Sequence, residues 1–315
     1  MTMLWRGVRN GCDDRRGRRA VDWCSRVLAA AVVLGLLAAA APARAQAGAA
    51  DGAAALRERY AALAEPLRNN AFGRALHLDS VQNSGDLRGD IHAVLEHSFA
   101  TLSAALSTAE PWCDVLMLHL NVKQCRIESA APGTTLAVHV GRKFDQPLEE
   151  AYRVDFAFRA VVATPEYLNV ALRADSGPMG TRDYRITLQA VPLGAGRSFM
   201  HLSYSYSYGM AARLALQAYL STLGSAKVGF SVAEKRADGQ PVYVGSVRGV
   251  VERNTMRYYL AIDAYLASLQ VPPAQQPERR LRDWFAATER YALQLHEMDE
   301  ADYLAMKRKE FARKP

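Results

Sequence analysis

The chain has 315 residues, of which 50% are hydrophobic and 23% are charged, and it contains four cysteines. This composition excludes a disordered polymer, a collagen-like repeat and a small protein held together by many disulfides. The formal net charge of +7 is concentrated at the start of the chain, because residues 1–45 carry eight arginines against three acids. The other residues hold 31 basic and 29 acidic side chains, so the sequence predicts no nucleic-acid partner.

Residues 1–45 contain the three parts of a secretory signal peptide. Residues 1–26 are rich in arginine, an apolar run covers 27–41, and Ala43-Arg44-Ala45 precedes Gln46. The run is shorter than the roughly 20 apolar residues of a membrane span, so we expect no stable transmembrane anchor. We predict cleavage near Ala45-Gln46 and a periplasmic or secreted protein. An uncleaved anchor is the alternative, and both Sec and twin-arginine export stay open.

Cleavage leaves two cysteines, Cys113 and Cys125, and cysteines in an oxidising compartment usually pair. In one straight strand their sulfurs would lie roughly 40 Å apart, whereas a disulfide needs Cα atoms within about 7 Å. Residues 111–120 have helical spacing, and 122–127 are typical of a strand. We predict a Cys113–Cys125 disulfide that joins this helix to this strand, with two unpaired buried thiols as the alternative.

The mature chain begins with residues 46–70, which we expect to form a linker over 46–55 and one short helix over 54–67. Extended runs at 76–78 and 87–95 follow, around a turn at 83–86. Helical spacing then returns at 98–106, ahead of the helix at 111–120.

From residue 122 to 208, apolar and polar residues alternate, as in strands with one buried face. The clearest alternating stretches are 136–140, 153–162, 183–190 and 200–206. Breaks at 132–133, 177–180 and 194–196 contain glycine or proline and predict short connections between antiparallel neighbours. The alternation places His139 and His201 on the polar face, where we expect them to point into solvent.

The last third of the chain is mostly helical in pattern. We expect a helix at 210–224, a hairpin at 227–244 and the longest helix at 247–269. A helix opened by Pro277 carries one apolar stripe, and Asp299 begins a last, charged helix. The stripe consists of Leu281, Trp284, Phe285, Thr288, Tyr291 and Leu295.

This order of elements resembles the START-like superfamily, also called SRPBCC or the Bet v 1-like helix-grip fold. The resemblance covers about residues 71–270, with Trp112-Cys113-Asp114 leading to Leu120 at the place of the second helix. It implies an α+β fold in which a curved antiparallel sheet grips a long C-terminal helix, here followed by a helical C-terminal extension, 271–315. The segment 210–244, the extension and the disulfide depart from the family pattern. The resemblance also implies an apolar cavity between sheet and helix, which other members use for lipids, sterols or aromatic metabolites.

We predict that the apolar face of the sheet and the helix opposite it bind the ligand. The predicted residues are Phe156, Phe158, Ile186, Leu188, Leu202, Tyr204, Tyr206, Met256, Arg257 and Tyr258. The Tyr204 and Tyr206 hydroxyls would orient the polar head group of a ligand. The alternative is that these rings only form the buried face of a strand. Arg253 and Arg257 share one helix face, so an acidic group is expected beside them. That group is a carboxylate of the sheet, such as Asp155, or the carboxylate or phosphate of a bound lipid. The alternative is that the arginines are simply solvated.

The sequence contains no metal-ligand spacing, nucleophile motif or phosphate-binding loop, so we predict no catalytic residue, no metal and no cofactor. The resulting hypothesis is an exported binding or carrier protein whose partner is a hydrophobic small molecule or lipid. One alternative is a cyclase- or hydrolase-type enzyme of the same fold. Another is an envelope protein that binds a protein partner through its C-terminal helices, for which Trp284, Phe285 and Tyr291 would have to be exposed.

Overall fold

The computed structural model describes residues 48–130, 133–209 and 227–313. The chain divides into two units after Ala50, and of the first unit only residues 48–50, which are helical, are described. The predicted signal peptide and the helix expected at 210–224 therefore lie outside the described residues. Within the described ranges, no helix is both long enough and apolar enough to cross a membrane.

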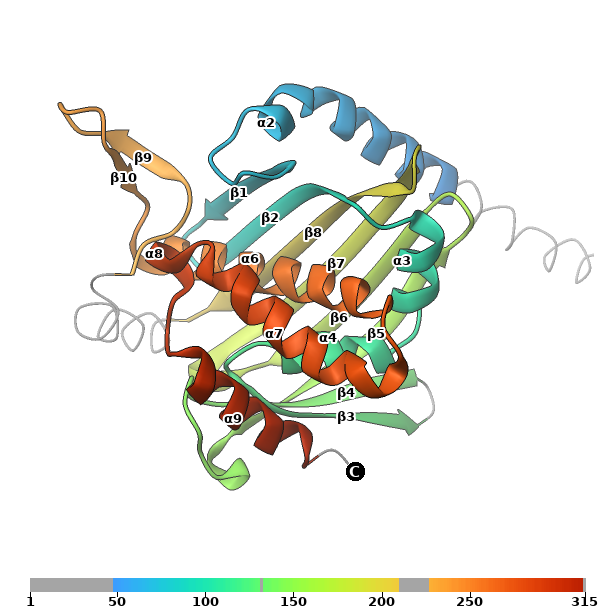
Figure 1. Ribbon diagram of the computed structural model, residues 1–315, viewed down its shortest axis with the longest axis vertical. Helices are drawn as coiled ribbons and strands as arrows, with labels where there is room; N and C mark the ends of the chain where they lie inside the picture. Colours follow the sequence, from blue (N-terminus) through green and yellow to red (C-terminus); the bar gives the residue numbers. More distant parts are fainter. Residues whose placement is uncertain (1–47, 131–132, 210–226, 314–315) are drawn as a thin grey trace, which may run out of the picture. The chain divides into compact units, whose positions relative to one another are not determined.

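The second unit is built on one antiparallel sheet of eight strands, in the order β1-β2-β8-β7-β6-β5-β4-β3 (Figure 1). β1 pairs with β2, each strand from β3 to β8 pairs with the next one along the chain, and the pairing of β2 with β8 joins these two parts of the sheet. The strands are β1 (Leu76–Gln82), β2 (Asp86–Leu95), β3 (Val122–Ala130), β4 (Gly133–Val140), β5 (Tyr152–Ala163), β6 (Leu168–Ser176), β7 (Thr181–Leu193) and β8 (Arg197–Tyr208). A separate two-stranded sheet is formed by β9 (Val232–Lys235) and β10 (Pro241–Tyr243).

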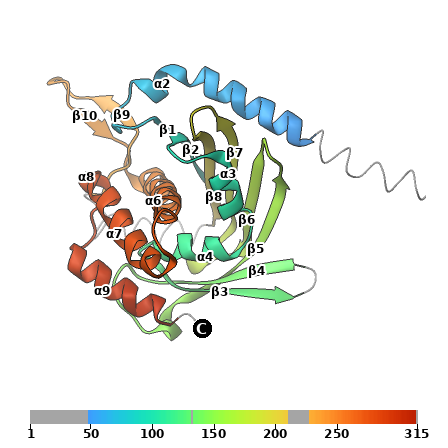
Figure 2. The same cartoon turned by 45° about the vertical axis from the view of Figure 1, so that its right-hand side comes forward.

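The sheet curves around the longest helix, α6 (Ser246–Ser268), as Figure 2 shows. Along β8 the inward-facing residues are buried and the outward-facing ones are partly exposed, which is the alternation that the sequence predicts. The helix lies close to the sheet at Gly89, where an added Cβ atom would clash with the Thr255 side chain. The α+β helix-grip architecture predicted from the sequence is confirmed.

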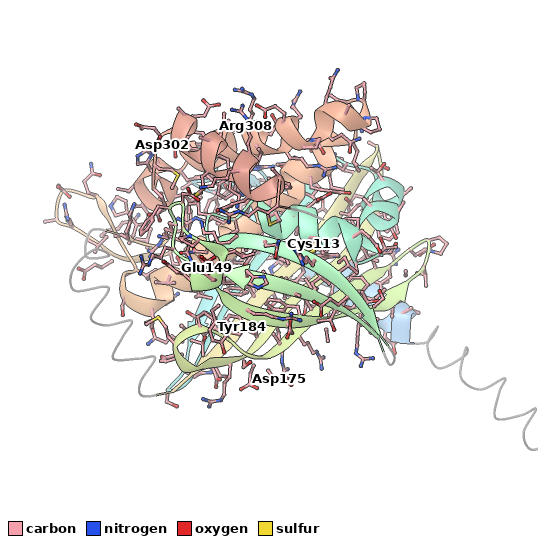
Figure 3. All side chains as sticks on the ribbon, turned by 90° about the horizontal axis from the view of Figure 1, so that it is seen from below. Cys113, Glu149, Asp175, Tyr184, Asp302 and Arg308 are labelled. Atoms are coloured by element: carbon pink, nitrogen blue, oxygen red, sulfur yellow. A yellow bond between two sulfur atoms is a disulfide. The ribbon has the colours of Figure 1, made fainter. Side chains whose placement is uncertain are left out.

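Two short helices, α3 (Phe99–Leu106) and α4 (Glu110–Met117), connect β2 to β3. Ser98 caps α3 by accepting a hydrogen bond from the backbone N–H of Thr101, at 3.1 Å. The chain then turns from α4 into β3, which brings the Cα atoms of Cys113 and Cys125 to 5.3 Å and closes a disulfide between them (Figure 3). The predicted disulfide and its place between helix and strand are confirmed.

The remaining helices are α2 (Ala64–Arg68), α7 (Gln276–Glu289), α8 (Ala292–Leu295) and α9 (Glu300–Phe311), with single 3-10 turns at Leu148–Glu150, Pro178–Gly180 and Pro273–Gln275. Three local predictions differ from the structure. Residues 51–55 are already helical, because a run of alanines favours helix over linker. Strand β6 lies in the alternating region but outside its four clearest stretches. The helix opened by Pro277 ends at Glu289, and Tyr291 leaves helical geometry while its hydroxyl donates to the Phe72 carbonyl, at 2.9 Å.

The C-terminal extension packs on the sheet and on α6. On α7, the Trp284 indole N–H donates to the Arg257 carbonyl of α6, at 3.1 Å, and its ring stacks on Tyr303 of α9. On α9, Glu310 accepts from the ammonium groups of Lys123, at 2.9 Å, and Lys307, at 2.5 Å, and all three side chains are fully buried. Since a buried charge without its partner is strongly destabilising, this cluster fixes α9 against the beginning of β3.

Loss of the disulfide should reduce stability measurably. Replacing Cys113 and Cys125 together by serine should lower the free energy of unfolding by about 3 kcal/mol. The reason is that the bond joins residues 12 positions apart and so restricts the unfolded chain. Urea denaturation of the protein and the double variant measures the difference. Two free thiols in the unreduced, unfolded protein would contradict the prediction.

Candidate functional site

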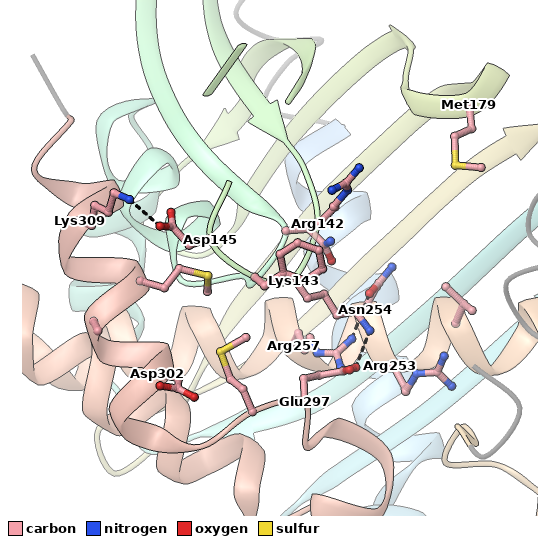
Figure 4. Close-up of a pocket in the computed structure, with 16 residues that line it drawn as sticks. Arg142, Lys143, Asp145, Met179, Arg253, Asn254, Arg257, Glu297, Asp302 and Lys309 are labelled. Atoms are coloured by element: carbon pink, nitrogen blue, oxygen red, sulfur yellow. Dashed lines mark hydrogen bonds and ion pairs between the residues drawn. The ribbon is translucent and has the colours of Figure 1, made fainter. Parts of the chain in front are cut away.

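A pocket of about 1120 Å³ lies where α6 meets the β4–β5 connection and the C-terminal extension (Figure 4). Its polar lining residues are Asn121, Arg142, Lys143, Asp145, Arg253, Asn254, Arg257, Glu297, Asp302 and Lys309. Its apolar lining residues are Phe144, Met179, Val250, Met298, Ala305 and Met306. Five cationic side chains therefore face three carboxylates among the lining residues, and apolar groups share the walls.

The floor of the pocket is formed by two arginines of α6. Arg253 and Arg257 are four residues apart on one helix face, and their exposed fractions are 2% and 1%. Arg253 donates to the carbonyl of Val228, at 3.0 Å. Arg257 donates to the carboxylate of Glu297, at 2.8 Å, and that carboxylate also accepts from Lys143, at 2.5 Å. The acidic group expected beside the arginines is thus Glu297 of the extension. The suggestion of Asp155 is wrong, since it pairs with Arg153 on the exposed outer face.

The charges on the floor alter one another's ionisation. Burial opposes the charge on Glu297, but Arg257 and Lys143 outweigh it and hold the pKa of this carboxyl below its usual value. Burial, reinforced by the nearby Arg257 guanidinium, lowers the pKa of Lys143 to about 8, even though Glu297 favours its charged form. Arg257 and Lys143 therefore share the negative charge of Glu297.

The rim of the pocket exposes two large apolar side chains. Phe144, on the β4–β5 connection, is 56% exposed, and Met179, in the turn between β6 and β7, is 64% exposed. Met179 also has a φ of 58°, a left-handed conformation that a side chain other than glycine rarely adopts. Met298 and Met306 line the pocket from the extension. With Phe144 and Met179, they form apolar walls around the charged floor.

Behind the floor, the rings of the sheet and helix form a packed cluster. Tyr184 stacks on Tyr206 with ring centroids 5.2 Å apart, and Tyr204 contacts Tyr258 of α6 edge-on at 5.3 Å. Burial raises the pKa values of Tyr204, Tyr206 and Tyr258 above the ordinary value, so their hydroxyls stay protonated. Asn254, which lines the pocket, opposes part of the rise in the pKa of Tyr204 and so lies close to this cluster.

Of the ten predicted ligand-binding residues, Arg257 lines this pocket. The other nine lie together between sheet and helix: Phe156, Phe158, Ile186, Leu188, Leu202, Tyr204, Tyr206, Met256 and Tyr258. Seven of these nine are buried, and Phe158 and Tyr258 are partly buried against them. All nine residues therefore belong to the hydrophobic core or pack against it. Their contact with a ligand stays a prediction.

The sequence prediction missed Lys143, Phe144 and Glu297. The segment Arg142-Lys143-Phe144 combines cations with an aromatic ring in a connection between strands, which is a recognisable signal. Glu297 gave no such signal, because its partners lie 40 and 154 residues away in the chain.

The outer face of the sheet holds a second charged cluster, beneath the helix at 51–62. The prediction that His201 points into solvent is wrong: its Nε2 lies 2.7 Å from Asp90, and its ring stacks on His92 at 4.3 Å. Burial opposes the charge on Asp90, but hydrogen bonds from His201 and Arg88 lower its pKa to about 2. Burial and then the neighbouring His201 lower the pKa of His92 to about 3. His139 is half-buried.

Across the described ranges, no group of three or more His, Cys, Asp or Glu side chains is arranged to hold a metal ion. The apolar stripe that begins on α7 and continues to Tyr291 is turned inward: Trp284 is 1% exposed, and Phe285 and Tyr291 are partly buried against the core. This stripe therefore offers no exposed docking surface.

No family model and no curated protein matches the chain. Among solved structures, the chain is similar to a norcoclaurine synthase from Thalictrum flavum, with 16% identity and a TM-score of 0.32 over 46% of this chain and 91% of that one. It is also similar to Ara h 8.0201, with 12% identity and a TM-score of 0.34 over 61% and 99% of the two chains. A START superfamily protein from Mycobacterium smegmatis shows 13% identity and a TM-score of 0.30 over 45% and 93%. Similarities at these scores carry no conclusion about what this chain binds.

The lowered pKa of Lys143 predicts unusual reactivity. At pH 8 about half of its amines should be neutral, whereas a lysine of ordinary pKa is almost entirely charged. Limited acetylation at this pH, followed by peptide mass spectrometry, should modify Lys143 many times faster than the exposed Lys235. Equal rates at the two residues would contradict the prediction.

Proposed function

We propose that this protein binds and carries an amphipathic small molecule in the pocket between α6, the β4–β5 connection and the C-terminal extension. The observation that carries the proposal is the pocket itself: it holds about 1120 Å³ and combines a buried guanidinium at its floor with apolar side chains in its walls. Binding sites for small molecules are usually concave and mostly apolar, with a few polar groups that orient the ligand, and hold about 300–1,000 Å³. This pocket is slightly larger than that range.

In this proposal, each end of the molecule contacts a different part of the pocket. Its polar end lies against Arg257 and Asn254, and its apolar part lies against Phe144, Met298 and Met306. The nine predicted residues lie in the hydrophobic core or pack against it, and a longer apolar chain would reach them by displacing the tyrosine rings. These assignments extend the ligand-binding role predicted from the sequence.

Export is part of the proposal. It rests on the signal-peptide pattern of residues 1–45, and the Cys113–Cys125 disulfide is consistent with it, because disulfides persist in oxidising compartments. A carrier in the periplasm or outside the cell would move a poorly soluble molecule through water.

An enzyme of the same fold is the second candidate, and the pKa of about 8 at Lys143 is the observation in its favour. An amine that is partly neutral near physiological pH is suited to general-base work. A carrier returns its ligand unchanged, so mass spectrometry of amphiphiles released from the purified protein distinguishes the two candidates.

The pocket can be blocked without disturbing the core. Ala305 lines the pocket from the exposed side of α9, so Ala305→Trp adds bulk to the pocket and none to the interior. We expect this variant to bind 11-(dansylamino)undecanoic acid at least roughly tenfold more weakly than the unmodified protein, as measured by fluorescence titration.

The matched control is Ala301→Trp, an exposed position on the same helix that does not line the pocket. It should bind the probe as the unmodified protein does. Equal binding by all three proteins would place the ligand site elsewhere, and absence of binding by the unmodified protein would contradict the proposed function itself.

A further inference from the structure

Glu297 is shared by an unusual number of cations. Its carboxylate lies 2.8 Å from Arg257, 2.5 Å from Lys143 and 3.6 Å from Lys227, and its side chain is 11% exposed. Arg257 is almost completely buried, and a buried guanidinium needs an anion beside it because removal from water is costly. The floor of the pocket is therefore a site built for a carboxylate, and in this structure the chain provides that carboxylate from within.

The position of Glu297 in the chain allows it to leave. Glu297 belongs to the short connection between α8 and α9, in which His296 has extended backbone angles. Neither helix uses the backbone of Glu297 for a hydrogen bond within its own turns. This connection also contributes Met298 to the pocket lining. A shift of a connection breaks fewer packing contacts than a shift of a helix.

Glu297 also lies on the same floor as the groups expected to contact a ligand. Arg257, which holds it, lines the pocket together with Lys143 and Asn254. Another carboxylate entering the pocket could accept the same charge-assisted hydrogen bonds from Arg257 and Lys143 that Glu297 accepts here. Two carboxylates competing for one pair of donors repel each other, so entry of the second favours departure of the first.

We propose that Glu297 holds the place of a ligand carboxylate, and that the pocket selects amphipathic carboxylic acids, whose head group displaces Glu297 from Arg257 and Lys143. The inference rests on the proposed function and adds to it the chemical class of the ligand and an internal competitor. Glu297 neutralises the buried arginine while the pocket is empty. Because it competes with the head group, it also lowers the affinity of the pocket for the ligand. Release of the head group is assisted when Glu297 returns.

The test compares 11-(dansylamino)undecanoic acid with its methyl ester, which differs only in lacking the charge. Glu297→Gln keeps the size of the side chain and removes the competing charge. The variant should bind the acid roughly tenfold more tightly or better, because one negative charge has been removed from beside the head-group site. Binding of the ester should change little. Fluorescence titration of both probes measures the two affinities.

The control is Glu278→Gln, which removes a carboxylate from the same extension at an exposed pair with Arg308 outside the pocket. It should leave both affinities unchanged. If Glu297→Gln lowers the melting temperature too far for titration, Glu297→Asp retains the charge on a shorter side chain and should give a smaller gain for the acid.

The outcomes separate the two proposals. Tighter binding of the acid alone supports the inference. Unchanged or weaker binding of the acid by both Glu297 variants, with the probe still excluded by Ala305→Trp, overturns the inference and leaves the proposed function standing. Failure of the unmodified protein and of every variant to bind either probe overturns the proposed function.

Discussion

The arrangement of this protein depends on a charged group in an apolar position: Arg257 lies in the middle of α6, the helix that the sheet surrounds, and is 1% exposed. A guanidinium there requires a carboxylate, and the nearest one comes from Glu297, 40 residues later. The Arg257–Glu297 pair therefore holds the C-terminal extension against the helix-grip core. The hydrogen bond from Trp284 to α6 and the buried cluster of Lys123, Glu310 and Lys307 beside β3 hold it there as well. The pocket lies where this tie is made, so the extension forms part of the site.

Much of the fold could be predicted from local pattern. Alternation of apolar and polar residues marks strands such as β8, and the spacing of Trp112 and Leu116 marks α4, which placed the two cysteines close enough to pair. What the pattern could not show depends on contacts distant in sequence. The break at Tyr291 is held by a hydrogen bond to Phe72, and the burial of His201 depends on a helix more than 130 residues earlier. Neither contact leaves a trace in the nearby residues.

The candidate site was predicted in part, for the same reason. The sequence identified Arg257 and required an acid beside it, because two cations on one helix face are unfavourable. It could not identify Glu297, since many acids lie in the chain and only the tertiary fold selects one. The nine predicted sheet and helix residues do belong to one hydrophobic cluster or pack against it, and large side chains such as Tyr204 and Tyr206 contact each other within it. Whether a surface encloses space depends on packing, which alternation does not encode.

The most direct test of the account is to find where an amphipathic acid lies on the protein. A fatty acid carrying a photoreactive diazirine in its chain can be bound, irradiated and located by peptide mass spectrometry. The account predicts crosslinks in the β4–β5 connection around Phe144 and in the extension around Met298 and Met306, all of which line the pocket. Crosslinks confined to the outer face of the sheet, around His92 and the helix at 51–62, would contradict it.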